Sequence, residues 1–277
     1  MGAASKQRAV AFARGLGLLP LFESVKFLFA ACAAAKENRD FLAGHPDFAP
    51  PPLWWMHDMY THASYALYMR SGAETAAEIA KRIDQHVEAK YPRVADWGCG
   101  LARVVRHLPT HYQLTGFDYN RAAINWCAEH IEGATFHVNA AAPPLPAEAG
   151  VFDALYALSV FTHLSAAGHA AWIGEVERVL RPGGLFLGAF HAAPAEGQLL
   201  PSERARFEKG ALVVRGGVKE GGRTFTAFQS EAYLRGELLA NFDIVEGPTP
   251  FFGQTLFVAQ RRQGLASSAR PAQQTDS

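Results

Sequence analysis

A glycine-rich turn follows a hydrophobic, strand-like run within Val94–Arg103 (VADWGCGLAR). Gly98 and Gly100 let a ligand approach the backbone closely, as nucleotide-like ligands do at the switch point of a parallel sheet. A dinucleotide fingerprint would need a third glycine where Arg103 stands, so NAD and FAD are disfavoured. Asp96 would repel a pyrophosphate but suits a ligand that carries an ammonium or a sulfonium. The turn therefore predicts a cationic cofactor.

Asp118 is a second candidate ligand for that cofactor. It follows Gly98 by 20 residues and closes the next strand-like run, where an acidic side chain accepts hydrogen bonds from ribose hydroxyls. The alternative role is structural, as a strand-end residue that caps the helix expected at Asn120. A nucleoside with a free ribose and a cationic end fits both carboxylates, and S-adenosylmethionine is such a molecule.

The elements that position these residues begin near Tyr91. Short β-rich runs there alternate with amphipathic, helix-length segments, which is typical of a parallel sheet with crossover helices. The predicted strands are Arg93–Trp97, Gln113–Phe117, Ala134–Val138, Ala154–Leu158 and Leu185–Phe190, with closing runs at Asp243–Glu246 and Thr255–Gln260. Helices are expected after the glycine turn, after Asn120 and after Ser165. Asn120 and Ser165 are the expected N-caps of their helices, and Pro182-Gly183-Gly184 is expected to end the helix that starts at Ser165.

Three helical segments are expected before the sheet. The first covers Gly15–Ala35, the second Trp54–Arg70, and the third follows Ser71-Gly72 and carries a helical stripe made by Ala76, Ile79, Ile83 and Val87. The predicted organisation is a helical cap over residues 1–90, a core over 91–262 with an insert or lid at 191–225, and a disordered tail over 263–277.

The first of these segments resembles a signal peptide, because it is apolar and follows three basic residues. Pro20, Glu23 and Lys26 interrupt the run, so no transmembrane segment is predicted. Phe22, Val25, Phe29 and Cys32 share one helical face. We expect this face to pack on the rest of the protein, in preference to the alternative of peripheral attachment to a membrane surface.

The chain resembles the class I S-adenosylmethionine-dependent methyltransferases. The blocks that carry the resemblance follow the family order between Tyr91 and about Phe190: Val94–Arg103, Phe117–Asn120, Asn139–Pro146, Phe152–Leu164 and Glu175–Phe186. The resemblance implies an α/β, Rossmann-like, seven-stranded and mostly parallel sheet with an antiparallel last strand, preceded by the helical cap. It also implies S-adenosylmethionine as cofactor.

The resemblance assigns roles to individual residues. The methionine end is expected at the glycine turn, the ribose after the second strand, and the adenine after the third. The implied cofactor-binding residues are Asp96, Gly98, Gly100, Arg103, Asp118, Tyr119, Asn139, Ala140 and Ser159. Two positions depart from the family pattern: Ala102 replaces the usual third glycine, and Asn139 stands where an aspartate is common but keeps an acceptor for the adenine amine.

Methyl transfer to a hydroxyl or an ammonium requires a proton acceptor, and histidine is suited to that role near neutral pH. His163 follows the fourth predicted strand and His191 follows the fifth, so both are candidate catalytic residues at the mouth of the sheet. Their alternative roles are a helix cap for His163 and an exposed loop residue for His191. Four residues of the aromatic segment could reach over the pocket: His57, Asp58, Tyr60 and His62. No metal site is expected, because His57 and His62 do not share a helical face well.

Composition narrows the function further. Apolar residues make up 49% of the 277-residue chain, and 26 basic residues balance 26 acidic ones. A globular protein is predicted, and nucleic acid is an unfavourable main partner because no overall positive field exists. Three scattered cysteines favour a reducing, cytoplasmic setting.

The resulting prediction is a methyltransferase that acts on an oxygen or nitrogen of a small-molecule acceptor. Two alternatives stay open: a membrane-linked glycan or lipid acceptor, and a non-catalytic S-adenosylmethionine-binding partner protein. The sequence does not identify the acceptor or the oligomeric state.

Overall fold

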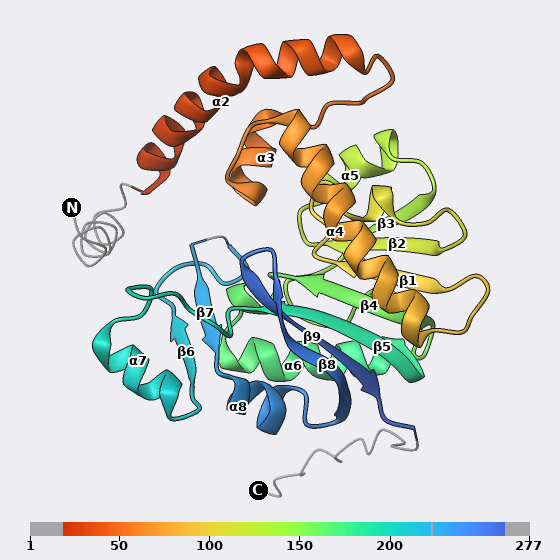
Figure 1. Cartoon of the computed structure of the whole chain (residues 1–277), viewed down its shortest axis with the longest axis vertical. Coiled ribbons are helices and arrows are strands. Elements are labelled where there is room, and N and C mark those ends of the chain that lie inside the picture. Colours follow the sequence, from red (N-terminus) through yellow and green to blue (C-terminus); the bar gives the residue numbers. More distant parts are fainter. Residues whose placement is uncertain (1–18, 223, 264–277) are drawn as a thin grey trace, which may run out of the picture.

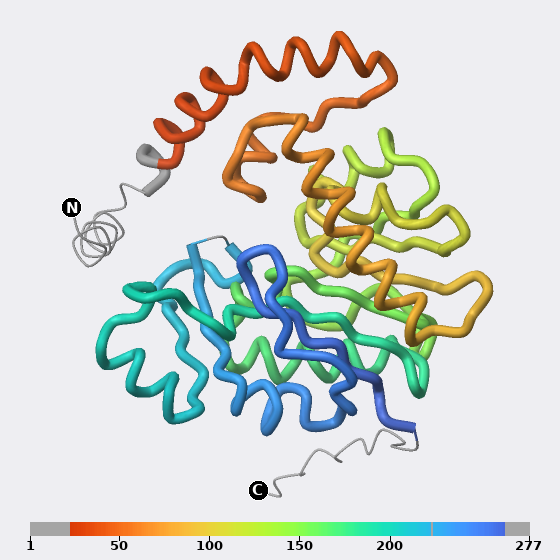
Figure 2. Tube along the Cα trace, viewed as in Figure 1, coloured from red at the N-terminus to blue at the C-terminus, as the bar shows by residue number. Residues whose placement is uncertain are grey.

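A computed structural model describes residues 19–222 and 224–263 (Figures 1 and 2). Its centre is a seven-stranded sheet of order β3-β2-β1-β4-β5-β9-β8. The first five strands are parallel, and β9 is antiparallel to both β5 and β8. The predicted Rossmann-like fold with an antiparallel last strand is thus confirmed.

All seven predicted strands are present, with small shifts of their ends. Their bounds are β1 Arg93–Trp97, β2 Gln113–Asp118, β3 Ala134–Val138, β4 Phe152–Leu158, β5 Leu180–Phe190, β8 Phe242–Phe251 and β9 Gln254–Arg261. The largest shift is in β5, which takes in Pro182-Gly183-Gly184 because the preceding helix α6 (Ala166–Val179) ends earlier than that tripeptide. A register shift against β4 between Phe152 and Ala154 accommodates the irregular segment.

Helices cover both faces of the sheet (Figure 1). On one face lie α4 (Tyr65–His86) and α5 (Arg121–His130), and on the other lie α6, α8 (Glu231–Tyr233) and η3 (Leu234–Leu238). The predicted stripe on α4 is confirmed, since Ala76, Ile79, Ile83 and Val87 are all buried in the cluster beneath it. Both predicted N-caps are also present: Asn120 accepts from Ala122 N and Ala123 N, and Ser165 accepts from Gly168 N.

The break between the second and third helical segments lies elsewhere than predicted. α3 (Leu53–Tyr60) ends at Thr61, which adopts a left-handed φ of 64°, and α4 starts after the N-cap Ser64 and runs through Ser71-Gly72 without a break. Gly72 serves packing instead: a Cβ there would lie 2.0 Å from the carbonyl oxygen of Arg103. The glycine therefore lets α4 approach the glycine turn.

The expectation of a helix directly after that turn is wrong. Gly98, Gly100 and Ala102 have φ values of 83°, 53° and 59°, and three alternating left-handed residues cannot continue an α-helix. Only the single turn η1 (Val105–His107) follows. Ala102 is fully buried and its N–H donates to Cys99 O at 2.9 Å, so alanine adopts the conformation usually given to glycine.

The N-terminal helix α2 (Leu19–Gly44) is longer than predicted, and the expectation for its apolar face is wrong. Val25 and Phe29 are 43% and 74% exposed, and Cys32 is exposed as well. The side chain of Phe22, the fourth member of that face, lies outside the described part. Within residues 19–222 and 224–263, no helix has both the length and the apolar character needed to span a bilayer.

The segment 191–225, expected as a loop or lid, contains regular structure. α7 (Pro201–Glu208) is followed by β6 (Leu212–Arg215), which pairs antiparallel with β7 (Thr226–Gln229) in a separate two-stranded sheet. Leu199, Val213 and Phe228 form its small core. The predicted disordered tail falls outside the described residues, apart from Gln263.

Candidate functional site

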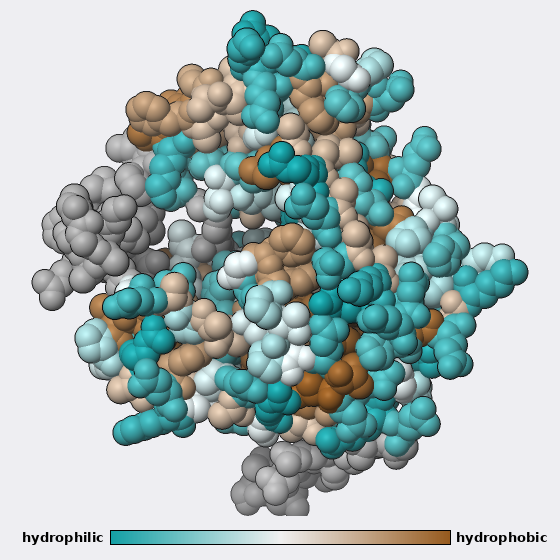
Figure 3. Space-filling view, in the orientation of Figure 1, coloured by the Kyte–Doolittle hydropathy of each residue, from teal (hydrophilic) through white to brown (hydrophobic). Residues whose placement is uncertain are grey.

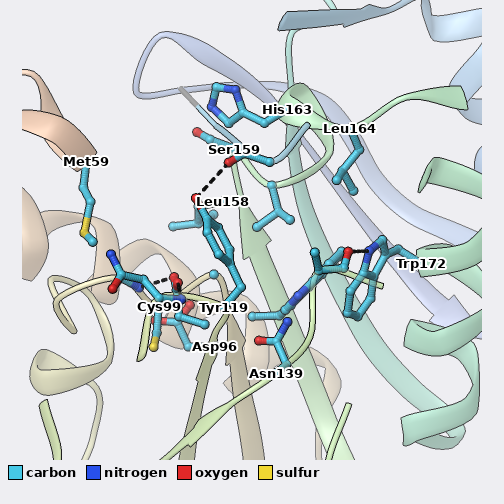
Figure 4. A pocket seen from close by; sticks show the side chains of 18 of the residues that line it. Met59, Asp96, Cys99, Tyr119, Asn139, Leu158, Ser159, His163, Leu164 and Trp172 are labelled. Carbon is cyan, nitrogen blue, oxygen red and sulfur yellow. Dashed lines mark hydrogen bonds between the residues drawn. The ribbon is translucent and has the colours of Figure 1, made fainter. Parts of the chain in front are cut away.

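A cavity of about 450 Å³ opens at the carboxyl ends of β1, β2 and β4 (Figure 4). Parallel strands present these ends at one edge, which brings residues from distant parts of the chain together. Of the predicted site residues, Asp96, Gly98, Gly100, Arg103, Asp118, Tyr119, Asn139, Ala140, Ser159 and His163 line it. His191 is not among the lining residues.

The glycine turn is held by hydrogen bonds to the end of β2. The N–H groups of Gly98 and Cys99 both donate to Phe117 O, at 2.8 and 3.1 Å. The next glycine, Gly100, donates its N–H to Asp118 Oδ2 at 3.0 Å. A Cβ on Gly98 would lie 2.5 Å from Val160 Cγ2, so only glycine fits between the turn and the loop after β4.

Asp118 supports the turn as well as facing the cavity. Its Oδ1 accepts from Asn120 N at 2.8 Å while its Oδ2 accepts from Gly100 N. Burial raises the pKa of this carboxyl, and the N–H donors of Asn120 and Gly100 oppose that shift. Asp118 therefore has a structural role, but it supports the glycine turn, since the helix cap weighed for it is Asn120. The lone pairs that its two hydrogen bonds leave suffice for a further pair of donors.

Asp96 is a buried acidic group of the cavity lining. Tyr156 donates its hydroxyl to Asp96 Oδ2 at 2.7 Å. Burial raises the pKa of Asp96 to about 7, although the Tyr156 hydrogen bond and the positive charge of Arg103 act in the opposite direction. A cation placed beside Asp96 would favour its ionised form.

Asn139 carries an unsatisfied acceptor. Its N–H donates to Asp118 O at 3.1 Å and its Nδ2 donates to Ala140 O at 2.7 Å. The buried Oδ1 has no hydrogen-bond partner among the described residues. Buried polar atoms are normally paired, so this oxygen is available to a ligand donor such as the adenine amine.

The cap contributes α3 to the cavity wall. Leu101 N donates to the Tyr60 hydroxyl at 3.0 Å, and the Arg103 guanidinium lies 5.4 Å from the centre of the Tyr60 ring. Asp58 and Tyr60 line the cavity as expected, together with Met59, which the sequence did not single out. His57 and His62 are not among the lining residues; His57 lies against Phe27 and Trp54 instead.

A strap made of Lys219, Glu220 and Gly221 closes one side of the cavity. It lies inside the segment 191–225 that was expected as an insert or lid, although the sequence did not single out these three residues. Tyr119 donates its hydroxyl to Gly221 O at 3.2 Å, and Gly221 N donates to His163 O at 2.9 Å. Glu220 Oε1 accepts from Ser165 N at 2.7 Å, at the N-terminus of α6. In Figure 4, His163 lies at the far side of the cavity from Asp96 and Asn139, whereas Tyr119 starts close to Asp96.

The two candidate histidines differ in position. His163 lines the cavity, and its Nδ1 donates to Phe225 O at 2.7 Å, so a neutral ring carries its lone pair on Nε2. His191 lies beside the ring of Phe228, and its Nδ1 donates to Ala227 O at 3.2 Å. Burial lowers the pKa of His191, and nearby His163 lowers it further.

Ser159 connects the cavity to the closing hairpin. Its φ of 64° is left-handed, and its hydroxyl donates to Gln254 Oε1 at 2.8 Å. Thr162, the neighbour of His163, also donates its hydroxyl to Ser159 O at 2.6 Å. Since Gln254 is the first residue of β9, this strand helps to position the loop that carries His163.

A family model described as a methyltransferase domain matches residues 94–184. The fold is similar to that of the PH0226 protein from Pyrococcus horikoshii OT3, with a TM-score of 0.52 and 19% identity over 70% of this chain and 91% of that chain.

Two further solved structures are similar. For DesVI from Streptomyces venezuelae the TM-score is 0.51, with 16% identity over 71% of this chain and 96% of that chain. For the glycopeptide N-methyltransferase MtfA, complexed with S-adenosylmethionine, the TM-score is 0.50, with 16% identity over 69% of this chain and 94% of that chain. At these identities the likeness is one of fold.

Proposed function

We propose that this protein, which is a class I S-adenosylmethionine-dependent methyltransferase, transfers the methyl group by in-line displacement to an oxygen or nitrogen of a small-molecule acceptor. The observation that carries the proposal is one cavity holding both the glycine turn with its carboxylates and the Nε2-basic ring of His163. The expected cap over 1–90 and core over 91–262, with its insert at 191–225, belong to the same proposal.

The residues present fit S-adenosylmethionine. Asn139 Oδ1, which has no hydrogen-bond partner among the described residues, suits the adenine amine. Asp118 keeps acceptor capacity for the ribose hydroxyls. The glycine turn admits the methionine end, with Asp96 facing positive charge and Arg103 facing a carboxylate. When bound, the cofactor supplies an electrophilic methyl group on a sulfonium.

The protein's part in the displacement is alignment, proton removal and exclusion of water. His163 is assigned to proton removal, because its Nδ1–H is donated to Phe225 O and its Nε2 can accept a proton from a hydroxyl or an ammonium. The Lys219–Gly221 strap and α3 are assigned to exclusion of water. His191 stays a weaker candidate for proton removal, since it lies outside the lining.

Two properties of the sequence support a small-molecule methyl acceptor and a cytoplasmic location. Equal numbers of acidic and basic residues argue against a nucleic-acid substrate, and three scattered cysteines suit a reducing compartment. The cavity volume of about 450 Å³ is within the range of small-molecule sites.

Calorimetric titration with S-adenosylmethionine, S-adenosylhomocysteine and NAD, followed by mass analysis of an acceptor panel, tests the proposal. We expect binding of both adenosyl ligands, no binding of NAD, and a gain of one methyl group on a hydroxyl or amine acceptor. Adenosyl binding without turnover on any acceptor would favour a non-catalytic partner protein instead.

A further inference from the structure

An exposed apolar stripe runs along α2. Val25, Leu28 and Phe29 are 43%, 59% and 74% exposed, and exposed Cys32 continues the same helical face. Figure 3 shows hydrophobic side chains along the outer edge of the molecule, where α2 lies. Large apolar side chains that gather on one face of a surface helix mark an interaction site.

The opposite face of α2 holds the helix in place. The Phe27 ring packs edge-on against Trp54 with the ring centres 5.0 Å apart, and Ala34 is buried. Further along, Asn38 Nδ2 donates to Ala63 O at 2.7 Å, and Tyr65 N donates to Asn38 Oδ1 at 2.9 Å. These contacts keep the stripe facing outward, and it does not pack on the other elements that the structure describes.

The charge of the surrounding sequence indicates which kind of partner binds the stripe. The first 35 residues contain four basic side chains, Lys6, Arg8, Arg14 and Lys26, against the single acidic Glu23. The chain as a whole is neutral, so this excess is local.

We propose that the stripe of Val25, Leu28 and Phe29 docks on an anionic lipid surface, a partner that the local excess of basic residues in the sequence favours. A second copy of the chain fits less well. The second copy carries the same local excess of basic residues, so the two copies would not complement each other in charge.

This attachment is independent of methyl transfer. Trp54 lies in the first turn of α3, the helix whose far end supplies Asp58, Met59 and Tyr60 to the cavity wall. In the docked protein, α2 therefore lies between the lipid surface and α3, which carries part of the cavity wall. Lipid binding is measured without cofactor or acceptor, so its failure and a failure of the proposed function are distinguishable.

Sedimentation of the full-length chain with phosphatidylcholine vesicles, with and without phosphatidylglycerol, tests the inference. We expect binding to the anionic vesicles that weakens with added salt. The double variant Leu28→Ser/Phe29→Ser should lower the partition coefficient about tenfold or more, because it removes most of the apolar contact. Both side chains are exposed, so the variant should keep its thermal unfolding midpoint.

Two comparisons make the result specific. Tyr91→Ser, at a site 56% exposed and outside α2, should bind vesicles like the unchanged protein. Replacing Lys6, Arg8 and Arg14 by Gln should weaken binding to anionic vesicles alone. The inference is overturned by absent vesicle binding, by equal binding of the double variant, or by a dimer in sedimentation velocity that only the double variant loses.

Discussion

Tyr60 and Leu101 lie 41 residues apart, yet the Leu101 N–H donates to the Tyr60 hydroxyl at 3.0 Å. On the other side of the same residue, Tyr68 donates its hydroxyl to Leu101 O at 2.6 Å. Two tyrosines of the cap thus hold one residue of the glycine turn from both sides. The conformation of the cofactor site consequently depends on α3 and α4 as well as on the sheet.

Tyr60→Phe tests this coupling. It leaves the buried Leu101 N–H without its acceptor, which costs roughly 1 to 3 kcal/mol of unfolding free energy, and we expect weaker cofactor binding as well. Chemical denaturation and calorimetry measure the two effects. Tyr65→Phe is the matched control, because no hydrogen bond of the Tyr65 hydroxyl is found in the described part. Equal behaviour of the two variants would contradict the coupling.

Asp118→Ala tests the ribose assignment. The variant loses the acceptor for the ribose and also releases Gly100 N, so cofactor affinity should fall by about 1 to 3 kcal/mol. Calorimetry with S-adenosylhomocysteine measures the loss. Asp243→Ala, at the exposed ion pair with Arg262, is the control that keeps affinity. Unchanged affinity in Asp118→Ala would exclude contact between this carboxylate and the cofactor.

The affinity for S-adenosylmethionine should depend on pH through Asp96. Burial raises the pKa of Asp96 to about 7, so the neutral acid dominates below that pH and the carboxylate above it. A cationic ligand favours the carboxylate, and affinity should therefore rise with pH through this range, by at most about tenfold per pH unit. Titrations across the range check this, and Asp96→Asn should remove the slope.

The raised pKa of Asp96 also makes the stability of the folded protein depend on pH. The folded-state pKa of Asp96 lies above its ordinary value, so the stabilisation it brings is present at low pH and is lost as pH rises through about 7. Asp96→Asn, which still accepts from Tyr156, should raise the unfolding temperature more above pH 7 than at acidic pH. A uniform gain at every pH would mean that burial of the charge is not its cause.

His163→Ala should lower the turnover number by about 10² to 10⁴, as loss of a general base does, while cofactor affinity stays the same. The pH profile of turnover should also lose its acidic limb. His191→Ala is the informative comparison, since His191 lies outside the cavity lining. If it abolishes turnover and His163→Ala does not, the assignment of the base must be reversed.

Local patterns were sufficient where a segment and its immediate surroundings decide the outcome. Asn120 and Ser165 cap helices because their side chains reach N–H groups two or three residues ahead, and the strands follow their runs of β-branched and apolar residues. The stripe on α4 was readable for the same reason, since helical periodicity shows which side must be buried.

Prediction failed where a distant contact overrides local preference. Ser71-Gly72 reads as a helix break, but the tight approach of Gly72 to Arg103 O makes the glycine a packing residue inside α4. The α2 stripe reads as a buried face, but Phe27, Ala34 and Asn38 take the inward positions.

By itself, the sequence determined the order of the strands along the chain, the glycine turn, and the carboxylates and amide at successive strand ends. These features depend on residue type and on spacing over a few residues. Tertiary structure alone decided that Tyr60, the Lys219–Gly221 strap and Gln254 surround that turn. Their contacts join segments 41 to 102 residues apart, and such contacts form only when the packed sheet and its cap hold both partners in place.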